Sequence, residues 1–240
     1  MNAEITGIGW ITAAGMGCGK DHENFFKPST KLPENVSSAA FDASYPYYRR
    51  MDQYSRLGLT AIDFALQDAG LAEWREKRNI GIIASTLYGC LGTDVDYYDT
   101  VMAREGLGAS PALFSYTLPN TFLGEAAIRF GLTGTSFVIN ELHPSGLSGL
   151  QMALDHIACG EIEKILCGVC EIGCPPAFSG HSNVPSGAIF IMIEKLAGKK
   201  FSSYGKLHLN KTGCVIFNGG EIKDLTDLVQ RCIAGYRSFS

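Results

Sequence analysis

The feature that most limits the fold of this chain is an alternation of short apolar segments with helix-patterned segments. Runs of apolar and β-branched residues predict strands over 4–12, 79–85, 137–140, 162–169 and 187–193. Patterns with helical period predict helices between them, over 52–69, 94–104, 122–129 and 145–158. Strands that alternate with helices are typical of an α/β protein whose sheet has helices on both faces.

The segment 52–69 carries the clearest helical pattern. Apolar side chains recur at steps of three and four residues, from Tyr54 through Leu57 and Ala61 to Ala69. Gly70 follows directly, and glycine commonly ends a helix because it adopts positive φ without strain. Further along, the tail carries two β-like pieces and a helix, over 204–209, 214–217 and 223–234.

Composition excludes several classes of protein. Only 18% of the residues are charged and 46% are hydrophobic, which excludes a disordered chain and indicates that a partner covers part of the surface. The net charge of −4 argues against nucleic-acid binding. No run of 18 apolar residues exists, so no membrane span is expected. With no secretory signal at its start, the chain is expected to be cytoplasmic and its eight cysteines to be reduced.

Two glycine motifs do not fit the cofactor sites that they resemble. Gly7-Ile8-Gly9 follows the first strand, but Thr12 stands where a dinucleotide fingerprint has its third glycine. Gly19-Lys20 is followed by Asp21, where a phosphate loop needs Ser or Thr. We therefore expect no cofactor.

A cysteine array also invites a metal interpretation. Cys167, Cys170 and Cys174 have the spacing C-x2-C-x3-C, and His181 follows. Such pairs can hold zinc or an iron–sulfur cluster. However, Cys167 and Cys170 lie three apart on a predicted strand and should point to opposite faces. We interpret them as buried thiols and expect no metal.

The most informative segment is 134–150, where a short strand leads through His143 and Pro144 into a helix rich in small residues. Proline is favoured at the first helical position, which places His143 at or beside the N-cap. There, free backbone N–H groups and the helix dipole favour anions, so a neutral imidazole is expected. Small residues such as Gly146 and Gly149 indicate that this helix is buried.

At this point an ordered set of blocks resembles β-ketoacyl-acyl-carrier-protein synthases of the thiolase superfamily. The resemblance covers roughly residues 4–195 and is carried by Thr6-Gly7-Ile8-Gly9, Met51-Asp52-Gln53-Tyr54-Ser55, Asp68-Ala69-Gly70-Leu71, Asn79-Ile80-Gly81-Ile82, Leu118-Pro119-Asn120, the run from Ala127 to Gly134 and the strand Ile165 to Glu171.

The resemblance implies a thiolase-like α/β fold. The expected architecture is one βαβαβαββ half, with a mainly parallel, mixed five-stranded sheet and helices on both faces. Residues 1–200 would form the synthase-like N-terminal domain, and 201–240 an extension packed on the same domain. Relatives also carry a C-terminal half, with two histidines and an oxyanion segment, that has no counterpart in these residues.

The departures from the family decide the functional expectation. The family's nucleophilic cysteine aligns with His143, flanked by Glu141 and Ser145. An acyl-imidazole is labile to water, so the resemblance implies an acyltransferase ancestry without condensing activity, and whether the chain is an enzyme stays open. The expected function is a partner or accessory subunit in acyl-carrier-protein-dependent fatty-acid or polyketide biosynthesis, as a homodimer or as a heterodimer with a complete ketosynthase. The helix 145–158 would then present apolar surface to the partner, or the tail after Phe201 would cover part of it.

Two alternatives remain. The first is a residual acyl-thioester hydrolase or malonyl decarboxylase that uses His143 with Glu141 or Ser145. The second is a module that binds acyl chains or acyl carrier protein without chemistry. In that module the basic side chains would receive the acidic carrier protein, namely Lys20, Arg49, Arg50 and Arg56.

Overall fold

The computed structural model describes residues 2–19, 25, 32, 45–103, 105–175, 178, 184–196 and 203–237. Within these residues nine strands form one sheet, in the order β4-β3-β5-β6-β1-β7-β8-β9, with β2 paired to β1 outside this path. The strands are β1 Ala3–Thr12, β2 Gly15–Cys18, β3 Ile80–Thr86, β4 Ser136–Asn140, β5 Lys164–Glu171, β6 Gly187–Lys195, β7 Gly205–Leu209, β8 Val215–Phe217 and β9 Gly220–Glu221.

The α/β class is confirmed, but the expected sheet was too small and too parallel. Only β3 pairs in parallel, with β4 on one side and β5 on the other. The other six pairings among the described strands are antiparallel. The tail causes much of the difference, because β7 pairs with β1 along Ala3–Ile5 and continues the sheet. The stretch after Ala14 adds β2 as a hairpin with β1.

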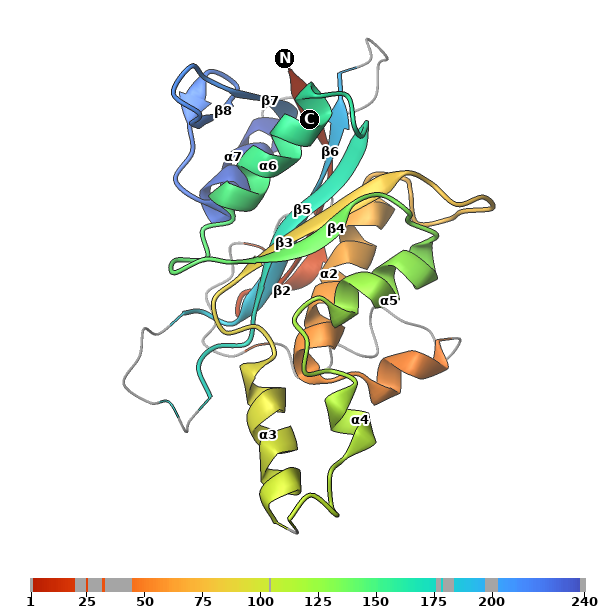
Figure 1. Cartoon of the computed structure of the whole chain (residues 1–240). Coiled ribbons are helices and arrows are strands. Elements are labelled where there is room, and N and C mark those ends of the chain that lie inside the picture. Colours follow the sequence, from red (N-terminus) through yellow and green to blue (C-terminus); the bar gives the residue numbers. More distant parts are fainter. Residues whose placement is uncertain are drawn as a thin grey trace.

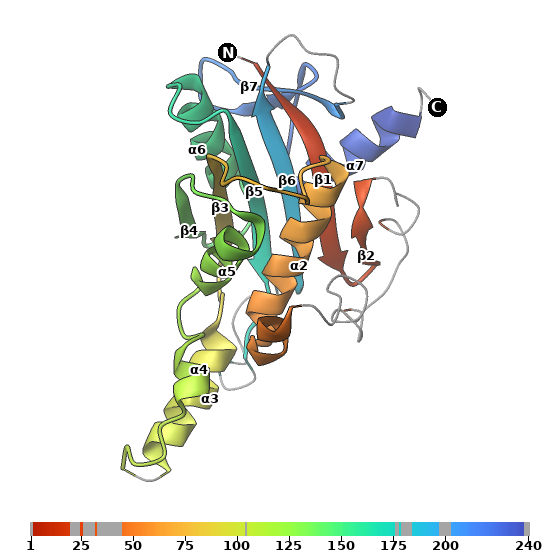
Figure 2. The same ribbon diagram turned by 90° about the vertical axis from the view of Figure 1, so that its right-hand side faces the viewer.

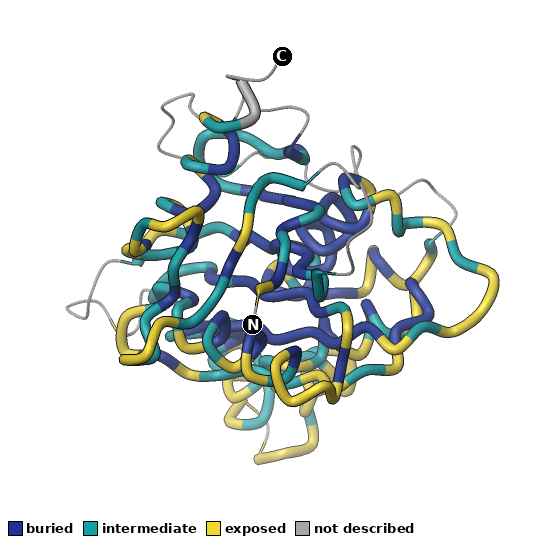
Figure 3. The backbone as a smooth tube through the Cα atoms, turned by 90° about the horizontal axis from the view of Figure 1, so that it is seen from above, coloured by how far each residue is buried: buried dark blue, intermediate teal, exposed yellow. Residues whose placement is uncertain are grey.

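Helices cover both faces of the sheet, as expected. One face carries α2 (Gln53–Asp68) and α5 (Thr121–Phe130), and the other carries α6 (Leu147–Ala158) and α7 (Leu225–Arg237) (Figure 1). Each central strand alternates its side chains between two cores. On β6, for example, Phe190 packs toward α2 and Ile191 toward α6. Figure 3 shows the consequence, since the buried backbone follows the central strands and the exposed backbone follows the periphery.

Local signals define α2 as predicted. The carboxylate of Asp52 accepts a hydrogen bond from the Ser55 backbone N–H at 2.9 Å, which caps the helix N-terminus. At the other end, Gly70 has φ +69° and its N–H donates to the Gln67 carbonyl. The Gly7-Ile8-Gly9 motif serves this packing, because a Cβ on Gly7 would lie 2.3 Å from the Ala65 carbonyl oxygen of α2.

The tail packs on the face of the sheet that carries α6. Five side chains of α7 are buried in the same core as α6, namely Leu225, Leu228, Val229, Cys232 and Ile233. Of the two possibilities for the inward side of α6, cover by the tail is the one that the structure shows. On its outward side, the large apolar side chain is Met152, which is 42% exposed.

Two helices leave the body of the molecule. Helix α3 (Leu91–Met102) runs away from the sheet and α4 (Pro111–Phe114) returns beside it (Figure 2). This arm exposes several large apolar side chains: Tyr98, Met102, Leu107, Phe114 and Leu118.

A short 3-10 helix, η2 (Pro46–Arg50), precedes α2. Among the described residues, no helix has the length and apolar character that a membrane crossing requires.

Candidate functional site

The loop 141–146 joins β4 to α6 at one edge of the sheet. Strands β4, β3 and β5 are parallel, so their carboxyl ends meet at this edge. In open α/β sheets, ligands usually bind in the crevice beyond the carboxyl ends of the strands. The loop holds the three site residues expected from the sequence: Glu141, His143 and Ser145.

Glu141 is buried and holds the loop. Its Oε1 accepts a hydrogen bond from the Ser85 hydroxyl at 2.9 Å. Its Oε2 accepts from the Gly146 backbone N–H at 3.2 Å and, at 3.5 Å, from the Ser145 hydroxyl. Both carboxylate oxygens are therefore hydrogen-bonded, Oε1 to β3 and Oε2 to the start of α6.

The loop enters the helix later than the sequence predicts. Helix α6 begins at Leu147 with Gly146 as its N-cap, so Pro144 does not occupy the first helical position and His143 lies three residues before the cap. The cause is a long-range contact, since the Leu225 backbone N–H donates to the Ser145 carbonyl at 2.9 Å. Gly146 adopts φ +76°, which turns the chain into the helix.

His143 is exposed at the surface of this loop. Within the described part of the chain, its ring makes no hydrogen bond to Glu141 or to Ser145. The Ser145 hydroxyl accepts from the Leu147 N–H at 3.2 Å and so caps the first turn. The three expected residues share one loop, yet they do not form the hydrogen-bonded chain that activates a nucleophile.

The cysteines do not supply an alternative nucleophile at this position. Cys167 lies beneath α6, with its Sγ 3.5 Å from the place of a Cβ on Gly149, and it is fully buried. Burial, and to a smaller extent the charge of Glu141, raises the pKa of its thiol well above the ordinary value. A thiol in this state is a poor nucleophile.

The cysteine array is divided by the sheet, as its spacing predicts. Cys167 belongs to the core under α6, and Cys170 belongs to the core under α2. Cys174 follows in the loop after β5 and donates to the Phe178 carbonyl, while His181 lies outside the described residues. No group of three metal-ligating side chains occurs within the described residues. The two strand thiols cannot share an ion across the sheet.

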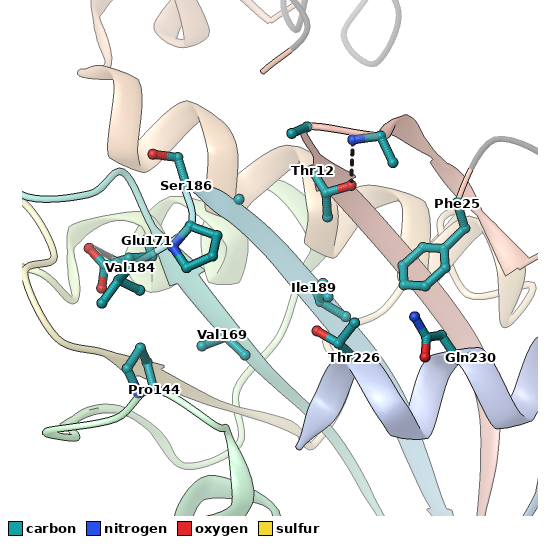
Figure 4. Close-up of a pocket in the computed structure, with 14 residues that line it drawn as sticks. Thr12, Phe25, Pro144, Val169, Glu171, Val184, Ser186, Ile189, Thr226 and Gln230 are labelled. Carbon is teal, nitrogen blue, oxygen red and sulfur yellow. Dashed lines mark hydrogen bonds between the residues drawn. The ribbon is translucent and has the colours of Figure 1, made fainter. Parts of the chain in front are cut away.

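A cavity of about 390 Å³ opens beside this loop. Its walls come from the ends of β1 and β5, the start of β6 and the first turns of α7 (Figure 4). Pro144 and Val169 line one part, and Thr226 and Gln230 project into it from α7. No motif in the sequence marks this site, because its walls come from segments far apart in the chain.

Glu171 is the buried acid of this cavity. Its Oε2 accepts hydrogen bonds from the Thr86 hydroxyl at 3.0 Å and from two backbone N–H groups, of Leu87 at 2.7 Å and Tyr88 at 3.1 Å. The carboxylate thus ties the end of β5 to the loop after β3. Its Oε1 is buried and has no hydrogen-bond partner among the described residues.

The basic residues expected to receive a carrier protein lie near the start of α2. Arg49 and Arg50 are exposed at the end of η2, and the Arg50 guanidinium lies 5.9 Å from the centre of the Tyr47 ring. Arg56 is half-buried and donates to the Asp52 carbonyl. Lys20 lies outside the described residues. The three arginines are exposed or half-buried near the start of α2, and their role stays a prediction.

With this geometry in place, comparison defines the class of protein. Residues 19–184 match the family model of the β-ketoacyl synthase N-terminal domain. The match covers most of the chain, and the chain belongs to this family.

Solved structures of similar fold come from ketosynthase complexes. The ishigamide ketosynthase/chain length factor aligns with a TM-score of 0.68 at 16% identity, over 86% of this chain and 62% of that one. A type II polyketide synthase acyl-carrier protein in complex with its ketosynthase, AntDE:AntF, aligns with a TM-score of 0.67 at 18% identity, over 86% and 67%. This chain thus spans less than two thirds of the first structure.

A third structure matches over nearly equal shares of both chains. It is the ketosynthase ApeO in complex with its chain length factor ApeC from Xenorhabdus doucetiae, with a TM-score of 0.57 and 19% identity, over 82% of this chain and 81% of that one. The matched chain is therefore of about the same length as this one. At these identities the three matches establish the fold.

Proposed function

We propose that this chain is a ketosynthase-like subunit without condensing activity, and that it pairs with a complete ketosynthase in acyl-carrier-protein-dependent biosynthesis of the polyketide type. The observation that carries the proposal is the loop before α6. His143 stands where the family resemblance places the nucleophilic cysteine, and its ring has no described carboxylate partner. Both oxygens of Glu141 are engaged. Loss of a nucleophile usually costs several orders of magnitude in rate.

The open edge of the sheet supports pairing with another chain. Strand β4 is the last strand on its side among the described residues. The Thr135 carbonyl and the Glu141 N–H bond to β3. Because backbone groups alternate along a strand, Ser136, Val138 and Asn140 turn their N–H and C=O groups toward the open side.

This edge lacks the features that keep natural edges unpaired. Its sequence, SFVIN, contains no lysine, no proline and no charge, and its three central side chains are only half-buried. Leu142, directly beyond the strand, is 83% exposed. An unprotected edge next to exposed apolar side chains suits the addition of a partner's strand. The complexes of ketosynthases with chain length factors support a ketosynthase as that partner.

The test is the mass of the purified protein, alone and mixed with a complete ketosynthase of its own pathway, by light scattering after size exclusion. We expect a stable complex with the ketosynthase. Val138→Pro removes one N–H that points to the open side of β4, and an edge strand tolerates proline at such a position. This variant should weaken the complex at least tenfold. Ile128→Arg, which alters an exposed side chain of α5, is the matched control and should leave the complex intact. A monomer that binds neither itself nor the ketosynthase refutes the pairing.

Activity is tested separately with malonyl- and acyl-thioesters. We expect no turnover above that of a His143→Ala variant. Turnover by the native protein that His143→Ala abolishes would instead establish the residual hydrolase or decarboxylase. The proposed complex and the proposed lack of activity are therefore tested independently of each other.

A further inference from the structure

The turn between β8 and β9 is made by an Asn-Gly pair. Phe217 and Gly220 are partners in the ladder, so Asn218 and Gly219 alone form the turn. Their φ values are +47° and +88°, which is the left-handed backbone that two-residue hairpin turns of type I′ require. Both residues are exposed. No other asparagine in the sequence is followed by glycine.

An Asn-Gly pair places a nucleophile next to an electrophile. The backbone nitrogen of Gly219 can attack Cγ of Asn218, because the two atoms belong to adjacent residues and close a five-membered ring. Glycine has no Cβ to crowd the attacking nitrogen. This nitrogen is available, since the Gly219 N–H makes no hydrogen bond to any described residue. The turn is also open, because a Cβ placed on Gly219 would meet no described atom within 4 Å.

Strand β7 holds the carbonyl that would be attacked. Oδ1 of Asn218 accepts a hydrogen bond from the Lys206 backbone N–H at 2.9 Å, and the Asn218 N–H donates to the Lys206 carbonyl at 3.0 Å. A glycine makes room for this contact, since a Cβ on Gly205 would lie 2.5 Å from Nδ2 of Asn218. Negative charge develops on Oδ1 when the ring closes, and a donor already directed at that oxygen stabilises it.

We propose that Asn218 is a site of spontaneous deamidation and that the fold promotes the reaction. The Gly219 nitrogen loses its proton to solvent and bonds to Cγ, the Cγ–Nδ2 bond breaks, and Nδ2 takes a proton from water and leaves as ammonia. A second water molecule opens the resulting succinimide at either carbonyl carbon and gives aspartate or isoaspartate. This modification goes beyond the pairing proposed above and does not depend on it, because all of its groups belong to one chain.

The isoaspartate product would alter the support of the tail. Its main chain runs through the former side chain, so the turn gains a carbon atom and can no longer hold Phe217 opposite Gly220. Val215 and Phe217 of β8 are buried in the same core as α6 and α7 (Figure 1). The Ile222 N–H, which follows β9, donates to the Val215 carbonyl at 3.4 Å. We therefore expect this hydrogen bond to loosen in the isoaspartate form.

The test incubates the full chain at pH 8, folded in buffer or unfolded in urea, and follows the peptide containing Asn218 by mass spectrometry. We expect conversion about fivefold faster in the folded chain, which corresponds to one net hydrogen bond. Asn210 is exposed and is followed by Lys211, so it is the internal control and should stay intact. No conversion of Asn218 refutes the site, and a folded rate equal to or below the unfolded rate refutes promotion by the fold.

Two variants at position 206 isolate the donor. Lys206→Pro removes the backbone N–H and should lower the rate to that of the unfolded chain. Lys206→Ala is the matched control, because it removes the amine, keeps the N–H and should react at the native rate. A native rate in Lys206→Pro shows that the donor plays no part. If this variant lacks a native spectrum, the comparison of folded and unfolded chains decides alone.

Hydrogen exchange tests the effect on the tail. The isoaspartate form is separated from the native protein by anion exchange and compared with Asn218→Asp, which carries the same charge on an ordinary main chain. We expect the Ile222 amide to exchange about tenfold faster in the isoaspartate form. Equal exchange in the two proteins would show that the turn does not support the tail.

Discussion

Replacing Gly146 by alanine tests whether α7 holds the loop before α6. Gly146 has φ +76°, where a non-glycine residue costs about 1–2 kcal/mol. A Cβ at this position would lie 2.2 Å from Cδ1 of Leu225 and 3.2 Å from Cγ2 of Val169. An ordinary carbon contact is about 3.5 Å, so Leu225 must move by roughly 1.3 Å. Overpacking of this kind adds about 1–3 kcal/mol.

Gly160→Ala is a closely matched control. Gly160 also has φ +76°, but a Cβ there meets no described atom within 4 Å. It therefore measures the backbone cost alone. We expect Gly146→Ala to lower the free energy of unfolding by about 2–5 kcal/mol and Gly160→Ala by about 1–2 kcal/mol.

Urea unfolding followed by circular dichroism gives both values by linear extrapolation. A double variant with Leu225→Ala relieves the clash, so its destabilisation should be smaller than the sum of the two single effects by more than about 0.5 kcal/mol. If Gly146→Ala costs no more than Gly160→Ala, then Leu225 does not pack on the loop. The explanation given for the late start of α6 would then be wrong.

Two further predictions concern ionisable groups. Burial raises the pKa of Asp63 to about 6, although a hydrogen bond from Gln67 opposes the shift. A carboxyl group whose pKa is raised by folding stabilises the folded state at low pH, and this contribution is lost as the pH rises through 6. Asp63→Asn should therefore raise the free energy of unfolding by about 2 kcal/mol at pH 7.5 and by little at pH 4, and an equal gain at both pH values would contradict the burial argument. Iodoacetamide at pH 8 should modify exposed Cys159 in the native protein, as detected by mass spectrometry. Cys167 and Cys170 are buried and their pKa values are raised, so they should react only after unfolding. Labelling of either of these two thiols in the native protein would show that the sheet opens.

Elements with local signals were predictable from the sequence. The apolar period, the cap at Asp52 and the glycine at position 70 all lie within or next to α2, so no distant residue was needed to place it. The two faces of β5 were also predictable. Side chains alternate along any strand, so Cys167 and Cys170 must point to opposite faces of the sheet.

Elements that depend on distant partners were not predictable. Strand β2 is rich in glycine, which has low strand propensity, and it forms because β1 offers it a hairpin partner. The start of α6 shifts because Leu225 bonds to Ser145, which lies 80 residues away in the chain. The candidate site divides in the same way. The sequence places Glu141, His143 and Ser145 in one loop, but it does not show that both oxygens of Glu141 accept hydrogen bonds.

The sequence by itself determined the α/β class, the family blocks and the imidazole at position 143, since each depends on residue identity or on a short period along the chain. Tertiary structure alone decided the extension of the sheet by the tail, the packing of α7 beside α6 and the cavity that Glu171 lines. These features arise where segments remote in sequence meet, and burial there depends on which surfaces the folded chain brings together.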